Sequence, residues 1–150
     1  MPYAWQPVGE TIAINSQRSQ QLNVLGLMNR DGEMKSFVFE GAVDSAVVCA
    51  CFDQWVQEID KKTYVLVDNA PMHRSEEFEE KMKAWRKQNL VIIFNAPYAP
   101  ELNLIEIAWR KIKYEWLPFS AYQSLADLKH HLFDILKGIG SDYRIDFAAA

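Results

Sequence analysis

Two acidic residues stand where a fold could bring carboxylates together for chemistry. Asp68 ends the apolar run Tyr64–Val67, and turn-forming residues follow it at once. This pattern predicts a buried strand that delivers one carboxylate to its C-terminal edge, where open α/β sheets place their sites. Glu106 lies further along the chain, at the start of an amphipathic helical pattern. A carboxylate from a strand and another from a helix indicate a divalent-metal site for phosphoryl transfer.

The composition is that of a soluble globular protein. A chain of 150 residues is most simply one domain, and it is long enough to bury a sizeable core. Its net charge of −4 gives no general attraction to nucleic acid, so a DNA contact would have to come from a local basic face or from another domain. This charge argues against a self-sufficient DNA-binding protein.

Cysteine usage and hydropathy indicate that the protein is located in the cytoplasm. Cys49 and Cys51 lie too close together in a helical stretch to form a disulfide with each other, so we expect two small buried residues in a reducing compartment. The longest uncharged apolar run, Ala46–Phe52, is too short to span a bilayer. The N-terminus lacks the basic-then-apolar pattern of a signal peptide. We therefore expect a cytoplasmic protein without membrane contact.

The elements that must position the two acids alternate along the chain. Strand-like runs on either side of an Asp-Gly turn predict an antiparallel hairpin, and apolar residues at helical spacing predict helices. The predicted elements are strands over 22–28 and 34–39, a helix over roughly 44–61, a strand over 64–68, a helix from Ser75 to Asn89, a strand over 90–94, a helix from about 105 to Pro118, and a helix from Ser124 to Gly138.

Capping residues mark where these helices begin. Asp44 or Ser45, Ser75 and Ser124 can each accept a hydrogen bond from a first-turn backbone N–H group. Thr11–Ile14 could add a short strand ahead of the hairpin. The order of elements predicts the α/β class, with a mixed sheet covered by helices.

Two segments resemble the acid motifs of a known family of DNA-cutting enzymes. Asp68–His73 reads Asp-Asn-Ala-Pro-Met-His and resembles the Asp-Asn-x-x-x-His second acid motif of DDE transposases in the mariner superfamily. Pro97–Glu106 resembles their third acid motif, Pro-Tyr-Ser-Pro-x-Leu-Asn-Pro-Ile-Glu. Trp109 and Lys113 also fall where that family has an aromatic residue and a lysine. The bacterial insertion-sequence branch is the one that the chain resembles most, over roughly residues 5–137.

The resemblance implies an RNase H-like fold, a mixed sheet flanked by helices, in one partial catalytic domain over residues 1–150. In that family three carboxylates hold two Mg²⁺ or Mn²⁺ ions, which activate water or a DNA 3′-hydroxyl and stabilise the leaving oxygen. Asp68 and Glu106 would be the catalytic, metal-binding carboxylates of this chain. DNA, at the element ends and at the target, would be the substrate.

The chain departs from the family pattern in several places. Leu104 and Ala99 stand where the family has proline and serine, which are minor changes. The family's first aspartate should lie on a strand ahead of Trp5–Gly9, which falls upstream of Met1, and the N-terminal helix-turn-helix region is missing too. The other early acids fit loop or capping positions better, namely Glu10, Asp31 and Asp44. We therefore expect an N-terminally truncated domain that binds metal weakly and does not cleave DNA alone.

Loss of the first-acid strand would have a structural consequence. In the RNase H-like sheet that strand lies between the hairpin and the strand before Asp68, so its loss would leave two unpaired edges. Residues near Thr11–Ile14 could fill the place, a partner chain could supply a strand, or the fragment could fold poorly. We expect a homo-oligomer, specifically a strand-swapped dimer.

Three explanations fit a start at Met1. The chain could be the downstream half of a gene split into overlapping reading frames, in which case the upstream-frame product is a further partner. It could be a decayed remnant. It could also have been cut from a longer protein.

Several polar residues lie near the two acids in sequence. His73 is expected to hold the structure of the site rather than to bind metal directly. Asn69 and Asn103 are expected to fix loop geometry, with direct DNA contact as the alternative. Arg110 and Lys113 could face DNA phosphates or could belong to an ordinary solvated helix face, and the sequence leaves both open.

Two main functions follow from these observations. The first is the catalytic-domain portion of a transposase, which cleaves DNA and transfers strands with the help of a divalent metal. The second is a non-enzymatic relic or regulator that binds DNA or full-length transposase. An RNase H-like nuclease with a cellular function would fit the two acids, but it explains the Pro97–Glu106 segment less well.

Overall fold

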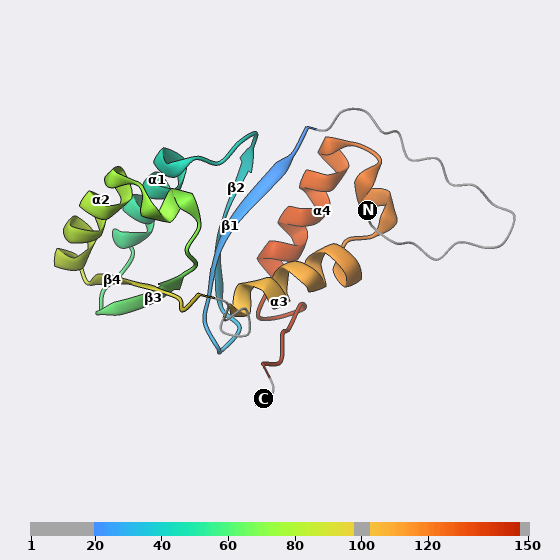
Figure 1. Ribbon diagram of the computed structural model, residues 1–150. Coiled ribbons are helices and arrows are strands. Elements are labelled where there is room, and N and C mark those ends of the chain that lie inside the picture. The colour runs from blue at the N-terminus through green and yellow to red at the C-terminus, as the bar shows by residue number, and fades with distance from the viewer. Residues whose placement is uncertain (1–19, 98–102, 148–150) are drawn as a thin grey trace, which may run out of the picture. The chain divides into compact units, whose positions relative to one another are not determined.

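The computed structural model describes residues 20–97 and 103–147 (Figure 1). These residues form an α/β protein whose elements belong to two compact units. One unit combines the chain up to Gly41 with the chain from Leu104 onward, and the other spans Ala42–Asn103. The strand predicted near 11–14 lies outside the described residues, and so does Ala99, which stands where the family has serine. Among the helices that the structure describes, none is long and apolar enough to cross a membrane.

The hairpin predicted from the sequence forms the sheet of the first unit. Strand β1 (Leu22–Met28) pairs antiparallel with strand β2 (Met34–Glu40). The side chain of Asn29 fixes the turn, because its Oδ1 accepts a hydrogen bond from the backbone N–H of Glu33 at 2.9 Å. Gly32 adopts a φ of 85° in this turn, a conformation that residues with a Cβ rarely take. The hairpin prediction is confirmed.

Two helices pack against this hairpin. Helix α3 (Leu104–Lys111) continues into a π-helical turn, η3 (Ile112–Trp116). A short 3₁₀ turn, η4 (Phe119–Tyr122), leads to helix α4 (Leu125–Gly138). The core of the unit combines buried side chains from η3 and α4 with hairpin side chains, namely Ile112, Leu132 and Ile135 with Leu22, Val24 and Val38. Burial of this apolar surface holds the helices on the hairpin.

The second unit combines two parallel strands with two helices. Helix α1 (Ser45–Val56) precedes strand β3 (Thr63–Val67), and helix α2 (Glu76–Lys87) precedes strand β4 (Leu90–Phe94). β3 and β4 pair in parallel, as a crossover through α2 requires. The helices are joined by a cluster of three buried aromatic rings whose centroids lie 5.1–5.9 Å apart, those of Phe52, Phe78 and Trp85.

The strand before Asp68 is buried on one face only, whereas the sequence predicts a strand buried throughout. Val65 and Val67 are 8% and 7% exposed, but Tyr64 and Leu66 between them are 60% and 49% exposed. Successive side chains of a strand point to opposite faces, so the apolar run supplies the core from alternate positions.

The predicted capping residues begin their helices. Side-chain oxygens of Asp44, Ser75 and Ser124 accept hydrogen bonds from first-turn N–H groups of α1, α2 and α4. Asn89, with a φ of 71°, follows α2 in the left-handed conformation that ends many helices. The helix predicted to reach residue 61 ends earlier, at Val56. The helix predicted to reach residue 118 instead changes to π geometry after α3.

The sheet differs from the single mixed sheet that the sequence predicts. The described residues contain two two-stranded sheets, β1–β2 and β3–β4. A single sheet needs a strand that pairs with the hairpin on one side and with β3 on the other, and no described strand does so. The α/β class is confirmed, but one continuous sheet is not formed by the described residues.

Candidate functional site

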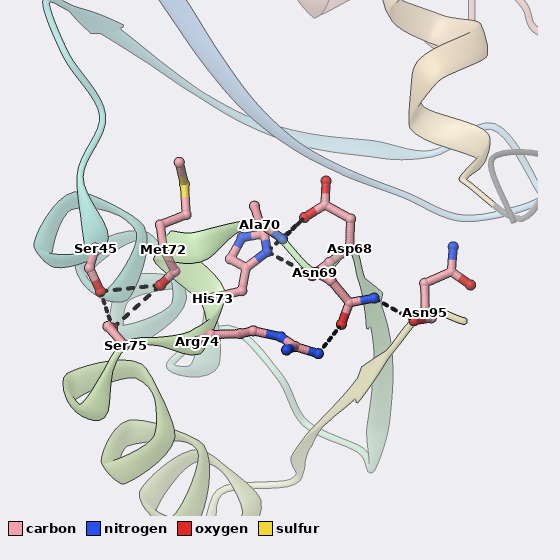
Figure 2. Close-up of polar contacts among 9 residues, drawn as sticks. All are labelled: Ser45, Asp68, Asn69, Ala70, Met72, His73, Arg74, Ser75 and Asn95. Atoms are coloured by element: carbon pink, nitrogen blue, oxygen red, sulfur yellow. Dashed lines mark hydrogen bonds and ion pairs between the residues drawn. The ribbon is translucent and has the colours of Figure 1, made fainter. Parts of the chain in front are cut away.

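Asp68 directly follows strand β3 at its carboxyl end, as predicted (Figure 2). Oδ1 of its carboxylate accepts a hydrogen bond from the backbone N–H of Ala70 at 3.0 Å and another from Nδ1 of His73 at 2.9 Å. The contact with Ala70 is an Asx turn, in which the side chain holds its own loop. The Asp68 side chain is 54% exposed. The strand end therefore offers an accessible carboxylate that is held through one oxygen.

The imidazole of His73 is held between this strand end and a buried ring. Its Nδ1 lies 3.1 Å from the backbone carbonyl oxygen of Asp68, in addition to the contact with the carboxylate. Both neighbours of Nδ1 are acceptors, so the hydrogen-bond network assigns a proton to Nδ1. The ring packs against Phe78 with centroids 5.4 Å apart, and the His73 side chain is 14% exposed. Only Nε2 is left for another partner.

A short 3₁₀ turn carries His73 to this position. The turn η1 (Pro71–Arg74) begins with proline, whose fixed φ suits the first position of a helical turn. Ser45 anchors it, because its Oγ donates to the carbonyl of Met72 at 3.2 Å and is hydrogen bonded to Oγ of Ser75. These two serines lie at the N-terminal ends of α1 and α2, so the turn is attached to both helices (Figure 2).

Asn69 ties the loop after β3 to the end of β4. Its Nδ2 donates to the backbone carbonyl of Asn95 at 2.8 Å, and its Oδ1 accepts from the guanidinium of Arg74 at 2.9 Å. Both ends of the Asn69 side chain are thus engaged within the protein (Figure 2). The Asn69 side chain therefore links the loop after β3 to Asn95 and Arg74.

Sequence reasoning missed Arg74 and Asn95 as members of this network. Asn95 follows β4 as Asp68 follows β3, and Val67 pairs with Phe94 in the strand register. Because the carboxyl ends of parallel strands meet at one edge, this position was the signal that could have identified Asn95. Arg74 carried a weaker signal, its place in the same motif segment as His73.

The second acid lies in the other unit. Glu106 is the third residue of α3 and is exposed. Among the described residues no hydrogen bond or ion pair is recorded for its carboxylate, which leaves both oxygens accessible. An acid in the first turn is favoured by the helix macrodipole.

Basic side chains follow Glu106 along α3 and the π turn. Arg110 and Lys113 are exposed. Lys111, between them, forms an ion pair with Glu115 at 3.1 Å and lies 5.9 Å from the centre of the Trp116 ring. Arg110 and Lys113 have accessible cationic groups on the segment that carries Glu106. Asn103 lies just before α3 and is half-buried.

The structure brings some of the predicted site residues together. Asp68, Asn69 and His73 lie in one loop region of the second unit, where Asp68 is hydrogen bonded to His73 and Asn69 is hydrogen bonded to Arg74 and Asn95. Glu106, Arg110 and Lys113 lie on α3 and η3 of the first unit. Within the described ranges, no group of three or more histidine, cysteine, aspartate or glutamate side chains is arranged to hold a metal ion.

The fold and these groups define an α/β protein with accessible carboxylates at the end of a parallel strand and at the start of a helix. A family model described as DDE superfamily endonuclease matches residues 1–129. The chain belongs to this family. Membership indicates a transposase-like nuclease function with DNA as the substrate, and DDE domains generally use divalent metals. No curated protein matches the chain.

Proposed function

We propose that the chain is the catalytic-domain portion of a transposase from the bacterial insertion-sequence branch of the mariner superfamily, with one RNase H-like domain. The complete catalytic domain would cleave DNA at element ends and transfer strands in the cytoplasm, whereas this portion alone would be inactive. The observation that carries the proposal is Asp68, an accessible carboxylate at the carboxyl end of β3 inside a chain matched by the DDE family over residues 1–129.

Asp68 and Glu106 would each serve as a carboxylate ligand for Mg²⁺ or Mn²⁺. The chemistry of these donors fits, because Mg²⁺ prefers oxygen ligands and is commonly held by one or two carboxylates together with waters and substrate phosphates. When bound, such ions activate the attacking oxygen and stabilise the leaving oxygen of a phosphoryl transfer. The protein's own part is to hold the two carboxylates accessible and to orient them.

The remaining site residues would serve the same reaction. Asn69 and His73 would fix the loop that carries Asp68, and Asn103 would fix the approach to α3. Arg110 and Lys113 would contact DNA phosphates, since their cationic groups are exposed on the segment that carries Glu106. Contacts of this kind position DNA without reading its sequence.

We further propose that the chain needs another polypeptide segment for cleavage. Among the described residues the acid at the end of a strand ahead of β3 is Glu40, and it forms an ion pair with Lys129 at 2.6 Å. The first metal-binding aspartate would come from an upstream-frame product. That product, or the partner in a strand-swapped homodimer, would supply the strand that a continuous sheet requires.

Nicking of supercoiled plasmid DNA in Mn²⁺ tests this function. We expect no nicking by the chain alone, and nicking by a fusion to the polypeptide encoded in an overlapping upstream frame. Asp68→Ala and Glu106→Gln should each abolish nicking by the fusion. Nicking that survives either substitution would contradict the assignment of that carboxylate.

The alternative is a non-enzymatic relic or regulator that binds DNA or full-length transposase. It predicts that no fusion nicks DNA, while the chain still inhibits transposition when it is co-expressed with an intact transposase of the same element.

A further inference from the structure

We propose that His73 is a positioning residue that reserves one oxygen of Asp68 for the metal. His73 and the Ala70 N–H together occupy Oδ1, so Asp68 presents Oδ2 alone and binds a divalent ion through a single oxygen. This inference rests on the proposed function only in assigning a metal to Asp68; the contacts that carry it belong to the second unit and need no other acid.

The first step is the occupancy of Oδ1. A carboxylate oxygen has about two lone-pair positions for hydrogen bonds. Oδ1 of Asp68 accepts from the Ala70 N–H at 3.0 Å and from His73 Nδ1 at 2.9 Å, which uses both. No hydrogen bond to Oδ2 is recorded among the described residues, and the side chain is 54% exposed. The two oxygens of one carboxylate are therefore in different environments.

The second step is the orientation of the imidazole. Nδ1 has two acceptors within reach, the Asp68 carboxylate at 2.9 Å and the Asp68 carbonyl at 3.1 Å. A ring flip would replace Nδ1 with a carbon and lose both contacts. Packing on Phe78 and an exposure of only 14% limit other ring positions. His73 therefore serves as a fixed donor, and a metal could reach it only through Nε2.

The third step is the support of the loop itself. The turn η1 (Pro71–Arg74) is tied to α1 and α2 through Ser45 and Ser75. The Asn69 side chain joins the same loop to the end of β4. A donor can orient a carboxylate only if its own backbone is fixed, and these contacts fix it. Partners that hold a metal ligand in this way typically change metal affinity by 10–100-fold when they are removed.

Two substitutions at position 73 separate the hydrogen bond from the packing. In His73→Phe an aromatic ring still packs against Phe78, but it cannot donate a hydrogen bond to Asp68. In His73→Asn the side-chain amide nitrogen lies close to the place of Nδ1 and can donate that hydrogen bond. Titration of the chain with Mn²⁺ alone, followed by electron paramagnetic resonance, gives the affinity. We expect His73→Phe to weaken Mn²⁺ binding by about tenfold or more. His73→Asn should stay within about threefold of wild type, because it restores the donor.

The Asp68→Ala variant distinguishes a failure of the proposed function from a failure of the positioning role of His73. If Mn²⁺ affinity is unchanged in Asp68→Ala, the metal assignment of the proposed function fails. If Asp68→Ala weakens binding but His73→Phe binds as wild type does, the metal assignment stands and the positioning role of His73 is overturned. Circular dichroism of each variant verifies that it is folded.

If Mn²⁺ binds too weakly for its affinity to be measured, a measurement on the metal-free chain tests the role of His73. Long-range ¹H–¹⁵N correlation spectra report which imidazole nitrogen carries a proton. We expect a protonated Nδ1 in His73, with its ¹⁵N shift changed in Asp68→Ala because the carboxylate acceptor is lost. An unprotonated Nδ1, or a shift that is unaffected by Asp68→Ala, would overturn the inference.

Discussion

The indole of Trp109 packs so closely on Gly26 that a Cβ at position 26 would lie 2.8 Å from two of its ring carbons. The same Cβ would lie 3.0 Å from Cδ1 of Ile105, one turn earlier on α3. α3 is therefore held on β1 through a position that only glycine fits without a shift. Glu106 belongs to the same helix, so this contact fixes a proposed metal ligand relative to the hairpin.

Gly26→Ala should lower the free energy of unfolding by about 1–3 kcal/mol, because the added methyl group overpacks a rigid aromatic contact. Urea denaturation measures the loss. In a Trp109→Leu background the same substitution should cost much less, since the ring that it meets is gone. An equal cost in both backgrounds would show that the penalty does not arise from Trp109.

The carboxylate of Asp53 joins α1 to α2 by accepting from Lys81 Nζ at 2.6 Å and from Trp85 Nε1 at 2.8 Å. Trp85 is fully buried, so Asp53→Ala should cost about 1–3 kcal/mol by leaving the indole N–H without an acceptor. Chemical denaturation at neutral pH measures this cost. Asp53→Asn keeps an acceptor and should cost less; an equal loss in both variants would contradict the role of the indole hydrogen bond.

The Asp53 contact also predicts a dependence of stability on pH. Burial raises the pKa of the Asp53 carboxyl, but the hydrogen bonds from Lys81 and Trp85 outweigh it and hold the pKa below its ordinary value of 3.8. Because the folded-state pKa is lowered, the stabilisation is present above the unfolded-state pKa and is lost as the pH falls through the folded-state pKa.

Urea denaturation at several pH values checks this sign. The stability difference between wild type and Asp53→Asn should be constant above about pH 5 and should shrink below about pH 4. A difference that grows as the pH falls would contradict the lowered pKa of Asp53.

The two cysteines should be unreactive in the folded chain. Cys49 and Cys51 are 2% and 4% exposed, and burial raises the pKa of both thiols. A raised pKa lowers the fraction of reactive thiolate, and burial blocks access. A thiol-reactive disulfide reagent should label neither residue in buffer and both in urea. Rapid labelling of either residue in buffer would contradict the packing of α1.

Contacts between near neighbours made much of the fold predictable. The Asn29 turn of the hairpin and the caps at Asp44 and Ser75 each depend on residues within one turn of the chain. Side-chain chemistry decides such contacts before any tertiary structure forms. The hairpin and the starts of α1, α2 and α4 could therefore be predicted from the sequence.

Contacts between distant residues could not be predicted in the same way. The hydrogen bonds from Asn69 to Asn95 and from Trp85 to Asp53 depend on how strands and helices associate. The π turn at Ile112–Trp116 packs through Ile112 against side chains of the hairpin and α4, which are distant in the sequence. In the candidate site, sequence patterns singled out Asp68 and His73 as candidates, but only the structure shows that the Ala70 N–H and His73 Nδ1 share one oxygen of the Asp68 carboxylate.

Paramagnetic broadening by Mn²⁺ tests the central claim, that Asp68 and Glu106 are metal-binding carboxylates, most directly. Substoichiometric Mn²⁺ added to the ¹⁵N-labelled chain broadens amide signals within a short distance of the bound ion. The proposed function predicts selective broadening at two segments, residues 68–73 and the start of α3 around Glu106. Asp68→Ala should abolish the broadening of the first segment, and Glu106→Gln should abolish that of the second. Broadening that spares either segment, or that is centred on other acids of the chain, would contradict the metal-binding role of the carboxylate concerned.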